Sequence, residues 1–173
     1  GGLIRGDDGR YEIGMHMWQL AVRRPSARRL RAESRSYLEE LLMTTGEHVQ
    51  VAVRDGIAAN YVERLSGRDA VPIVTDVGSR LPLHATGVGL ALLAGAPEHI
   101  FRGVIASNPR KFQPNTMTTE AELRRRLAEA RVTGIVTSIE ELTPGAFSVA
   151  AASRDATGTT LAAVATVASV TRR

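Results

Sequence analysis

Apolar residues in the first half of the chain are spaced first as in a helix and then as in a strand. Between Ser26 and Thr45 leucines recur on one helical face, and Gly46 then ends the periodicity. From residue 48 valines alternate with other residues, and Asp55-Gly56 is a hairpin turn signal. The pattern predicts a helix over 26–45 and strands over 48–54, 57–65 and 70–75.

The second half of the chain alternates short helical segments with strands. Pro97 suits the first turn of a helix, Thr118 or Thr119 can cap a later helix, and Gly134 ends that helix. Residues 76–83 contain glycine and proline without a clear period, which predicts an irregular stretch. The expected helices cover 86–95, 97–106 and 120–131, and the expected strands cover 135–138, 147–153 and 159–170.

The order of these elements predicts the fold class. Consecutive strands joined by tight turns favour antiparallel pairing. With 173 residues, one domain with a substantial core is expected. We therefore expect an α+β fold, an antiparallel sheet flanked by helices. A strand over 11–13 and a helix from Met15 to Arg24 precede it, and Pro25 ends that helix.

The composition narrows the function mainly by what the chain lacks. There is no cysteine, which excludes disulfides, thiolate catalysis, iron–sulfur clusters and most structural zinc sites. No apolar run reaches the ~18 residues that cross a bilayer, and no signal segment opens the chain. We therefore expect a cytoplasmic protein that does not associate with membranes. A net charge of +4 is too small to indicate that this chain binds DNA by itself.

Three parts of the chain carry a resemblance to a known family. They are Gly2–Ile4 with Gly9–Gly14, then Gly78–Ala94, and then Gly134–Glu141 with Gly145–Ala151. In order and spacing they resemble the IclR family of transcription regulators, over nearly the whole chain. The resemblance implies a winged helix-turn-helix, a linker helix and a GAF-like effector domain. It places a remnant of the wing and its exit strand at 1–14, the linker helix at 15–25 and the effector-binding domain at 26–173, without the DNA-reading helix or the family's C-terminal helix.

The most specific segment also has chemistry of its own. Thr86 can cap a helix whose first turn contains Gly87 and Gly89. Glycine allows close approach to the backbone, and a helix start binds anions through its free N–H groups. An acidic small molecule would suit this position. The alternative is that the glycines only let the helix pack closely against the sheet.

The resemblance implies an effector pocket built from several segments. Where members that bind small polar acids carry an acidic residue and hydroxyl groups, this chain has Ser138, Ala165 and Val167. We therefore expect a larger or more hydrophobic effector, an aromatic acid or a lactone, in preference to a two-carbon acid. The expected effector-binding residues are Ile73, Leu81, His84, Thr86, Gly87, Val88, Ser138, Ala146, Ser148, Ala165 and Val167.

Some of these residues also allow an enzymatic interpretation. His84 could act as a general base or a metal ligand, but the other histidines are scattered and no cysteine is present. A histidine hydrogen-bonded at the pocket rim is therefore favoured. No Gly-x-Ser-x-Gly turn surrounds Ser138 or Ser148, which favours contact residues over nucleophiles. We expect no catalytic residue, no metal and no cofactor.

A run of arginines lies near the predicted linker. Arg23 and Arg24 are the better candidates for contact with DNA phosphates, because they would lie nearest a DNA-binding domain. For Arg28, Arg31 and Arg35 a solvated helix face is favoured.

The leading hypothesis is a sensor domain that binds a small-molecule effector. It would act in a homodimer or tetramer and reach DNA through a winged helix-turn-helix missing from this chain. One alternative is a small GAF-like enzyme acting on a small acid or amide, which would need a cluster of acid, base and nucleophile. Another is a ligand-free dimerisation module, which a collapsed pocket would favour.

Overall fold

The structure is a computed structural model that describes residues 3–5, 11–13, 25–67 and 71–172. The chain divides into two compact units, residues 1–36 and 37–173. The first contains the antiparallel pair β1 (Leu3–Arg5) and β2 (Tyr11–Ile13) and the first part of helix α2 (Pro25–Thr45). The predicted linker helix, with Arg23 and Arg24, lies almost entirely outside the described residues. The prediction of a helix over 26–45 is confirmed.

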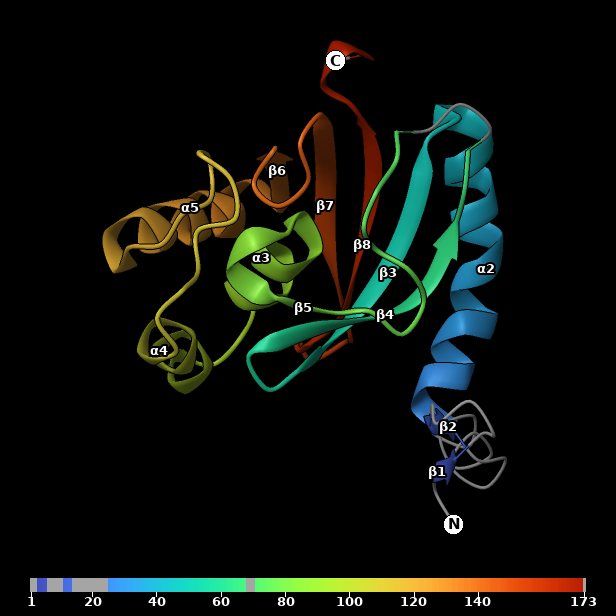
Figure 1. Cartoon of the computed structure of the whole chain (residues 1–173), viewed down its shortest axis with the longest axis horizontal. Coiled ribbons are helices and arrows are strands. Elements are labelled where there is room, and N and C mark those ends of the chain that lie inside the picture. Colours follow the sequence, from blue (N-terminus) through green and yellow to red (C-terminus); the bar gives the residue numbers. More distant parts are fainter. Residues whose placement is uncertain (1–2, 6–10, 14–24, 68–70, 173) are drawn as a thin grey trace. The chain divides into compact units, whose positions relative to one another are not determined.

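The second unit is built on a curled sheet of six strands (Figure 1). Its order is β5-β4-β3-β8-β7-β6, and all neighbouring strands are antiparallel. The prediction of an α+β fold with an antiparallel sheet is therefore confirmed. The strands are β3 (His48–Asp55), β4 (Ala58–Leu65), β5 (Arg80–Pro82), β6 (Ile135–Ile139), β7 (Ala146–Arg154) and β8 (Thr160–Ser169).

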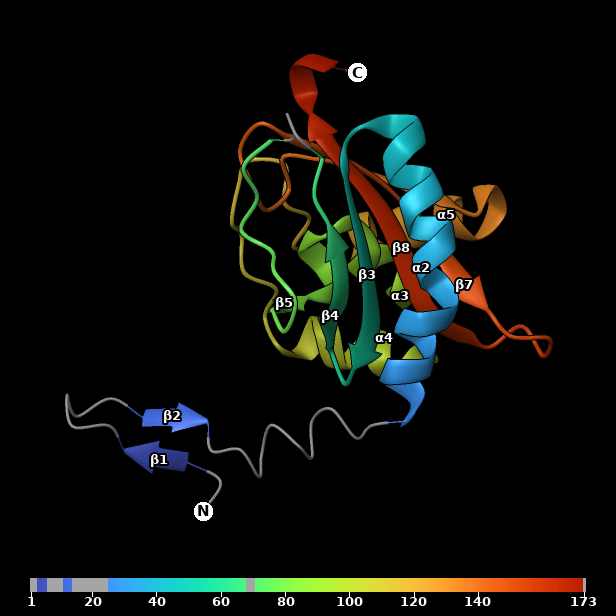
Figure 2. The same ribbon diagram turned by 90° about the vertical axis from the view of Figure 1, so that its right-hand side faces the viewer.

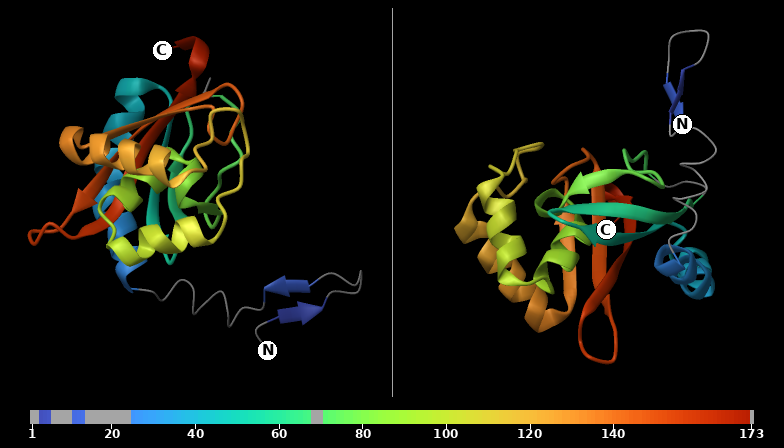
Figure 3. Two further views of the ribbon diagram at one scale, coloured as in Figure 1. Left: turned by 90° about the vertical axis from the view of Figure 1, so that its left-hand side faces the viewer. Right: turned by 90° about the horizontal axis from the view of Figure 1, so that it is seen from below.

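Helices cover both faces of this sheet (Figures 2 and 3). One face carries α3 (Gly87–Ala94), α4 (Glu98–Ala106) and α5 (Glu120–Thr133), and residues 37–45 of α2 lie on the other. Two short 3₁₀ helices, η1 (Leu83–Ala85) and η2 (Val170–Arg172), complete the unit. No helix among the described residues is long and apolar enough to span a membrane.

Helix α3 lies at the centre of the core. All eight of its residues are buried, and it packs on β3, β6, β7 and β8. The facing sheet positions are mostly small, including Ala52, Ala150 and Ala163, which lets the helix approach the strands closely. Because α3 is apolar all round, it is stable only as an enclosed element. Its start therefore lies inside the protein.

Strand β3 is buried on both faces. Val49 and Val51 are buried outside the α3 cluster, as is Leu38 of α2, whereas Ala52 belongs to that cluster. The valine alternation predicted the strand correctly. However, the alternate positions, among them Gln50, are as inaccessible as the valines.

The strand predicted over 70–75 is wrong for the described residues 71–75, which have no ladder partner. Their burial does alternate, since Ile73 and Thr75 are more buried than Val74. In place of a neighbouring backbone, side chains of the sheet donate hydrogen bonds to the Val71 and Thr75 carbonyls of this segment. A strand appears instead at Arg80–Pro82, in the stretch predicted to be irregular, because it pairs with the hairpin strand β4.

Candidate functional site

The start of α3 presents unpaired backbone donors inside the protein. Thr86 is the N-cap residue, and its hydroxyl accepts a hydrogen bond from the N–H of Gly89 at 3.1 Å. The N–H groups of Gly87 and Val88 precede any intrahelical acceptor. The aligned peptide dipoles add partial positive charge at the same place. The prediction that Thr86 caps this helix is confirmed.

The two glycines of this turn have different neighbours. A Cβ atom on Gly89 would lie 2.5 Å from the Leu83 carbonyl oxygen and 2.7 Å from the Leu83 Cα, both backbone atoms. A Cβ atom on Gly87 would lie 2.5 Å from the Ser148 hydroxyl oxygen, at the end of a rotatable side chain. The lack of a side chain at Gly89 therefore lets the helix pack closely against the Leu83 backbone. Gly87 lies against a polar side chain of the sheet.

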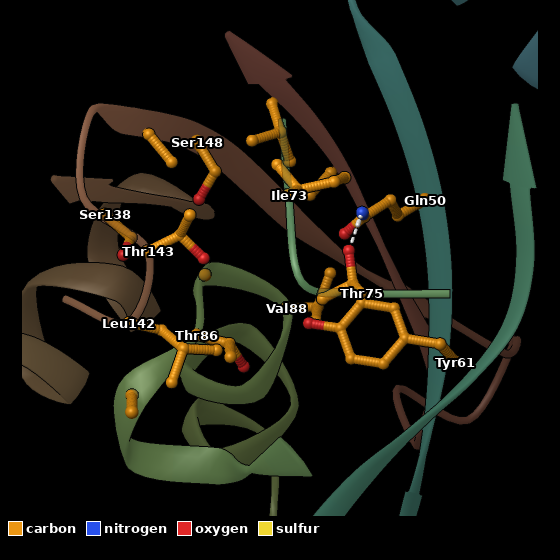
Figure 4. Close-up of a pocket in the computed structure, with 15 residues that line it drawn as sticks. Gln50, Tyr61, Ile73, Thr75, Thr86, Val88, Ser138, Leu142, Thr143 and Ser148 are labelled. Atoms are coloured by element: carbon orange, nitrogen blue, oxygen red, sulfur yellow. Dashed lines mark hydrogen bonds between the residues drawn. The ribbon is translucent and has the colours of Figure 1, made fainter. Parts of the chain in front are cut away.

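A cavity of about 50 Å³ lies between the start of α3 and the inner face of the sheet (Figure 4). Hydroxyl and amide groups alternate in its wall with apolar side chains, and no charged side chain among the described residues lines it. The lining residues are Gln50, Tyr61, Ile73, Thr75, Ala85, Thr86, Gly87, Val88, Ser138, Leu142, Thr143, Ala146, Ser148, Ala165 and Val167.

The structure brings most of the sequence-predicted residues together around this cavity. Leu81 and His84 do not line it; they line a separate, more open hollow of about 280 Å³ beside β5 and the start of the α4–α5 loop. Nine of the eleven predicted residues do line it, namely Ile73, Thr86, Gly87, Val88, Ser138, Ala146, Ser148, Ala165 and Val167.

Several lining residues were missed from the sequence. Gln50 and Tyr61 lie on β3 and β4 and point inward with their strands' period, so treating both faces of the hairpin as buried would have found them. Thr75 follows the same alternation in the extended segment. Leu142 and Thr143 belong to the loop between β6 and β7, and no local pattern marks them. Ala85 was also missed.

Residues 71–75 form one wall of the cavity and are held by side chains. The His48 Nε2 atom donates to the Val71 carbonyl at 2.9 Å. Thr75 is held twice, because its hydroxyl accepts from the Gln50 amide and its carbonyl accepts from Arg64. Gln50 therefore takes part both in the cavity wall and in the attachment of the segment. These hydrogen bonds come from side chains of the sheet, and no backbone ladder joins the described residues 71–75 to a strand.

Tyr61 is the titratable side chain among the described residues that line the cavity, and it stays neutral. Burial raises the pKa of Tyr61 to about 12, and a hydrogen bond with the Thr86 hydroxyl offsets only part of that effect. The phenol therefore remains protonated at neutral pH and can donate a hydrogen bond. A bound anion would meet hydroxyl groups and backbone N–H groups in place of a cation.

His84 is a buried structural residue of the neighbouring hollow. Its Nε2 atom donates to the Arg110 carbonyl at 2.9 Å, and its ring lies 6.0 Å from that of Phe112. Burial lowers the pKa of His84 below its usual value, and the bond to Arg110 offsets part of that effect. No group of three or more metal-binding side chains occurs in the part of the chain that the structure describes.

Comparison with known proteins identifies the relatives of this chain. The model of a family described as bacterial transcriptional regulator IclR C-terminal matches residues 25–173. The HTH-type transcriptional repressor AllR of Klebsiella pneumoniae is 34% identical over 129 residues, which cover 74% of this chain and 47% of that protein. AllR of Escherichia coli K12 is 30% identical over 157 residues, covering 90% and 58%. The chain spans about half the length of these curated relatives.

A solved structure supports the same family. An IclR homologue from Microbacterium hydrocarbonoxydans, crystallised as a complex with 4-hydroxybenzoate, matches with a TM-score of 0.88 and 35% sequence identity. The match covers 98% of this chain and 70% of that one. The relatives are transcriptional repressors, and their family is regulatory rather than enzymatic. The chain thus belongs to the IclR family of bacterial transcriptional regulators and contains that family's C-terminal, effector-binding domain.

Proposed function

We propose that this chain senses a small aromatic carboxylic acid, which it binds in the cavity at the start of α3. One observation carries the proposal: a cavity that no charged side chain among the described residues lines receives the N-terminal end of a helix. Binding would bias a transcription regulator between two states. The chain is similar to transcriptional repressors, which supports a regulatory role.

The carboxylate is assigned to the helix start. The Gly87 and Val88 N–H groups would donate to its oxygens, and the helix dipole would favour its charge. Tyr61 lies beside the helix start, next to the Thr86 hydroxyl, and its protonated phenol can donate a further hydrogen bond. The charge of the ligand would then be matched by fixed dipoles, with no counter-ion needed in the wall.

The rest of the ligand is assigned to the apolar part of the wall. Ile73, Val88, Leu142 and Val167 would surround a ring and shield it from water. A volume of about 50 Å³ holds only about three or four waters, so a ring requires the walls to move apart. Residues 71–75, held by side chains, supply that movement. The 4-hydroxybenzoate in the related complex supports an aromatic acid of this size.

The rest of the regulator is assigned from the family. We propose that residues 1–14 end a winged helix-turn-helix domain, that 15–25 form the linker helix, and that 26–173 form the sensor. Arg23 and Arg24 would contact DNA phosphates, and the assembly would be a cytoplasmic homodimer or tetramer. Ligand binding changes DNA affinity only if the two states of that assembly bind the ligand with different affinity.

Thermal-shift and calorimetric titration of the chain with acids tests the proposal. The panel contains benzoate, 4-hydroxybenzoate, phenylacetate and glyoxylate, with neutral benzamide as the control for charge. A binder at about 100 times its Kd adds about 2.7 kcal/mol, which raises the Tm by roughly 5–10 °C. Binding of glyoxylate without any aromatic acid would contradict the proposed ligand class.

Matched variants locate the binding site. Ala165→Leu fills the cavity from β8, while Ala151→Leu makes the same change at an exposed position on β7. We expect Ala165→Leu to lose binding and Ala151→Leu to keep it. A folded Ala165→Leu variant that binds the acids with unchanged affinity would place the site elsewhere and refute the proposal.

A further inference from the structure

A second recess lies apart from the cavity, between β5 and the loop that joins α4 to α5. This recess, here called the β5 hollow, has a volume of about 280 Å³, near the lower end of the range of about 300–1,000 Å³ typical of small-molecule sites. A cavity of about 150 Å³ already admits benzene. The β5 hollow can therefore receive a ring without any movement of its walls.

One part of the lining of the β5 hollow is apolar. Leu81 and Pro82 of β5 and Val104 of α4 contribute to it. Ile57, in the turn between β3 and β4, closes one side next to α4 (Figure 1), where a Cβ atom on Gly103 would lie 3.1 Å from the Ile57 Cγ2 atom. A ligand that covers this apolar surface gains free energy by removing it from water.

Two arginines line the β5 hollow from different elements. Arg80 belongs to β5 and Arg110 to the loop after α4, and no acidic side chain among the described residues lines the hollow. The Arg80 Nε atom lies 3.4 Å from the Asp55 Oδ2 atom, but both side chains are more than half exposed. An ion pair as exposed as this one contributes little, so the lining keeps a positive character that favours an anion.

The Arg110 guanidinium is oriented by an aromatic ring. Its Cζ atom lies 5.3 Å from the centroid of the Phe112 ring, and Phe112 also lines the hollow. Stacking of this kind uses the face of the planar guanidinium. Its N–H groups lie in the plane and stay free to bind a carboxylate.

Hydrogen bonds from buried side chains hold the loop that carries Arg110. The His84 Nε2 atom donates to the Arg110 carbonyl at 2.9 Å. The Thr116 hydroxyl accepts from the N–H groups of Phe112 and Gln113 at 3.1 and 2.8 Å. His84 and Thr116 are only 4% and 3% exposed. This wall is therefore formed in advance, and a ligand would not have to order it.

We propose that the β5 hollow is a second ligand site, which binds a carboxylic acid whose apolar body is larger than one ring. The carboxylate would bind Arg110, and Arg80 would add positive charge from β5. The apolar body would cover Leu81, Pro82 and Val104. This site goes beyond the proposed function, because it shares no described lining residue with the cavity at the start of α3.

Calorimetric titration of the whole chain with 2-naphthoate tests the inference. Neutral 2-naphthamide has the same rings and serves as the control for charge. We expect 2-naphthoate to bind more tightly than 2-naphthamide by about threefold or more. Because both arginines are exposed, this preference should shrink at about 1 M salt.

Matched variants locate the site of 2-naphthoate binding. Arg110→Gln removes the charge and keeps the backbone carbonyl that holds His84. Lys111→Gln makes the same change of charge at the exposed next residue, which does not line the hollow. We expect Arg110→Gln to weaken binding by about three- to tenfold and Lys111→Gln by less than about twofold. Adding Arg80→Gln to Arg110→Gln should weaken binding further.

Ala165→Leu, which fills the cavity, separates the two sites. This variant should bind 2-naphthoate with wild-type affinity. Loss of binding in a folded Ala165→Leu variant would assign the naphthoate to the cavity and overturn the inference. If Ala165→Leu does not fold, the arginine variants alone locate the site, because neither arginine lines the cavity.

Two other results would also overturn the inference. One is a wild-type chain that does not bind 2-naphthoate, and the other is unchanged affinity in the variant that lacks both arginines. Neither result concerns the binding of single-ring acids at the start of α3. A failure of this inference is therefore distinguishable from a failure of the proposed function.

Discussion

Replacing Gly89 with alanine should destabilise the fold, although alanine is the better helix former. The new Cβ would lie 2.5 Å from the Leu83 carbonyl oxygen and 2.7 Å from the Leu83 Cα. Backbone atoms of η1 cannot rotate away as a side chain can. The Cβ would also lie 2.5 Å from the Thr86 Oγ1 atom, which caps α3 through the Gly89 N–H. The substitution therefore strains the core and weakens the cap together.

The magnitude follows from three contributions. Overpacking a core costs about 1–3 kcal/mol, and loss of a threonine N-cap costs about 0.5–2 kcal/mol. Replacing glycine by alanine in a helix returns about 1 kcal/mol. The net loss is about 2 kcal/mol, which for a domain of this size lowers the Tm by roughly 4–8 °C.

Urea unfolding and thermal melting, both followed by circular dichroism, measure this loss. Gly87→Ala is the matched control, because it lies in the same helical turn and its Cβ meets mainly the rotatable Ser148 hydroxyl. We expect it to change stability by less than about 1 kcal/mol. Equal stability of the two variants, or a Gly89→Ala variant more stable than wild type, would refute the argument that the η1 backbone limits this position.

Three further predictions concern titration and capping. Because burial raises the pKa of Tyr61 to about 12, the free energy of unfolding should fall as pH rises from about 10 to about 12. In a tyrosinate absorbance titration of the folded chain, Tyr61 should ionise last, and Tyr61→Phe should remove that last absorbance step. A step near pH 12 that persists in the variant would contradict the assignment. Because burial lowers the pKa of His84, the unfolded chain binds its proton more readily, and stability should fall as pH drops below about 6.5. His84→Gln, which can still donate to the Arg110 carbonyl, should flatten that slope in pH-dependent urea unfolding; an unchanged slope would exclude this source. Thr119→Ala removes the capping box of α5, in which the Thr119 hydroxyl and Glu122 bond each other's backbone N–H groups. It should cost about 1 kcal/mol in urea unfolding, Thr119→Ser should not, and equal losses in both would count against the cap.

The cavity residues differ in how well local sequence patterns predicted them. Thr86, Gly87 and Val88 form one continuous segment with a capping residue and glycine, so the sequence marked them as a helix start. Ser138 and Ser148 form a cross-strand pair on β6 and β7, and only the resemblance to the family pointed to them. The burial of Glu141 carried no local signal, because nothing in the pattern indicates that a charged residue after a strand will be buried.

The error over residues 71–75 has a specific physical origin. Alternation of apolar and polar residues reports which side chains of an extended segment point inward, and Ile73 and Thr75 do point inward. It does not report whether another backbone lies alongside. Here His48 and Arg64 donate to the backbone carbonyls of Val71 and Thr75, as a neighbouring strand would otherwise do, and Gln50 donates to the Thr75 hydroxyl.

The sequence by itself determined most element types, the capped start of α3, the α+β class and the family. These depend on interactions between residues close in the chain, such as the Thr86 cap, or on periodicity within one element. Tertiary structure alone decided which elements enclose the cavity, that Leu81 and His84 line another hollow, and that Glu141 is buried beside Arg126. Those relations join residues far apart in the chain or depend on the burial of a whole layer, and burial is a property of the packed sheet and helices rather than of any segment.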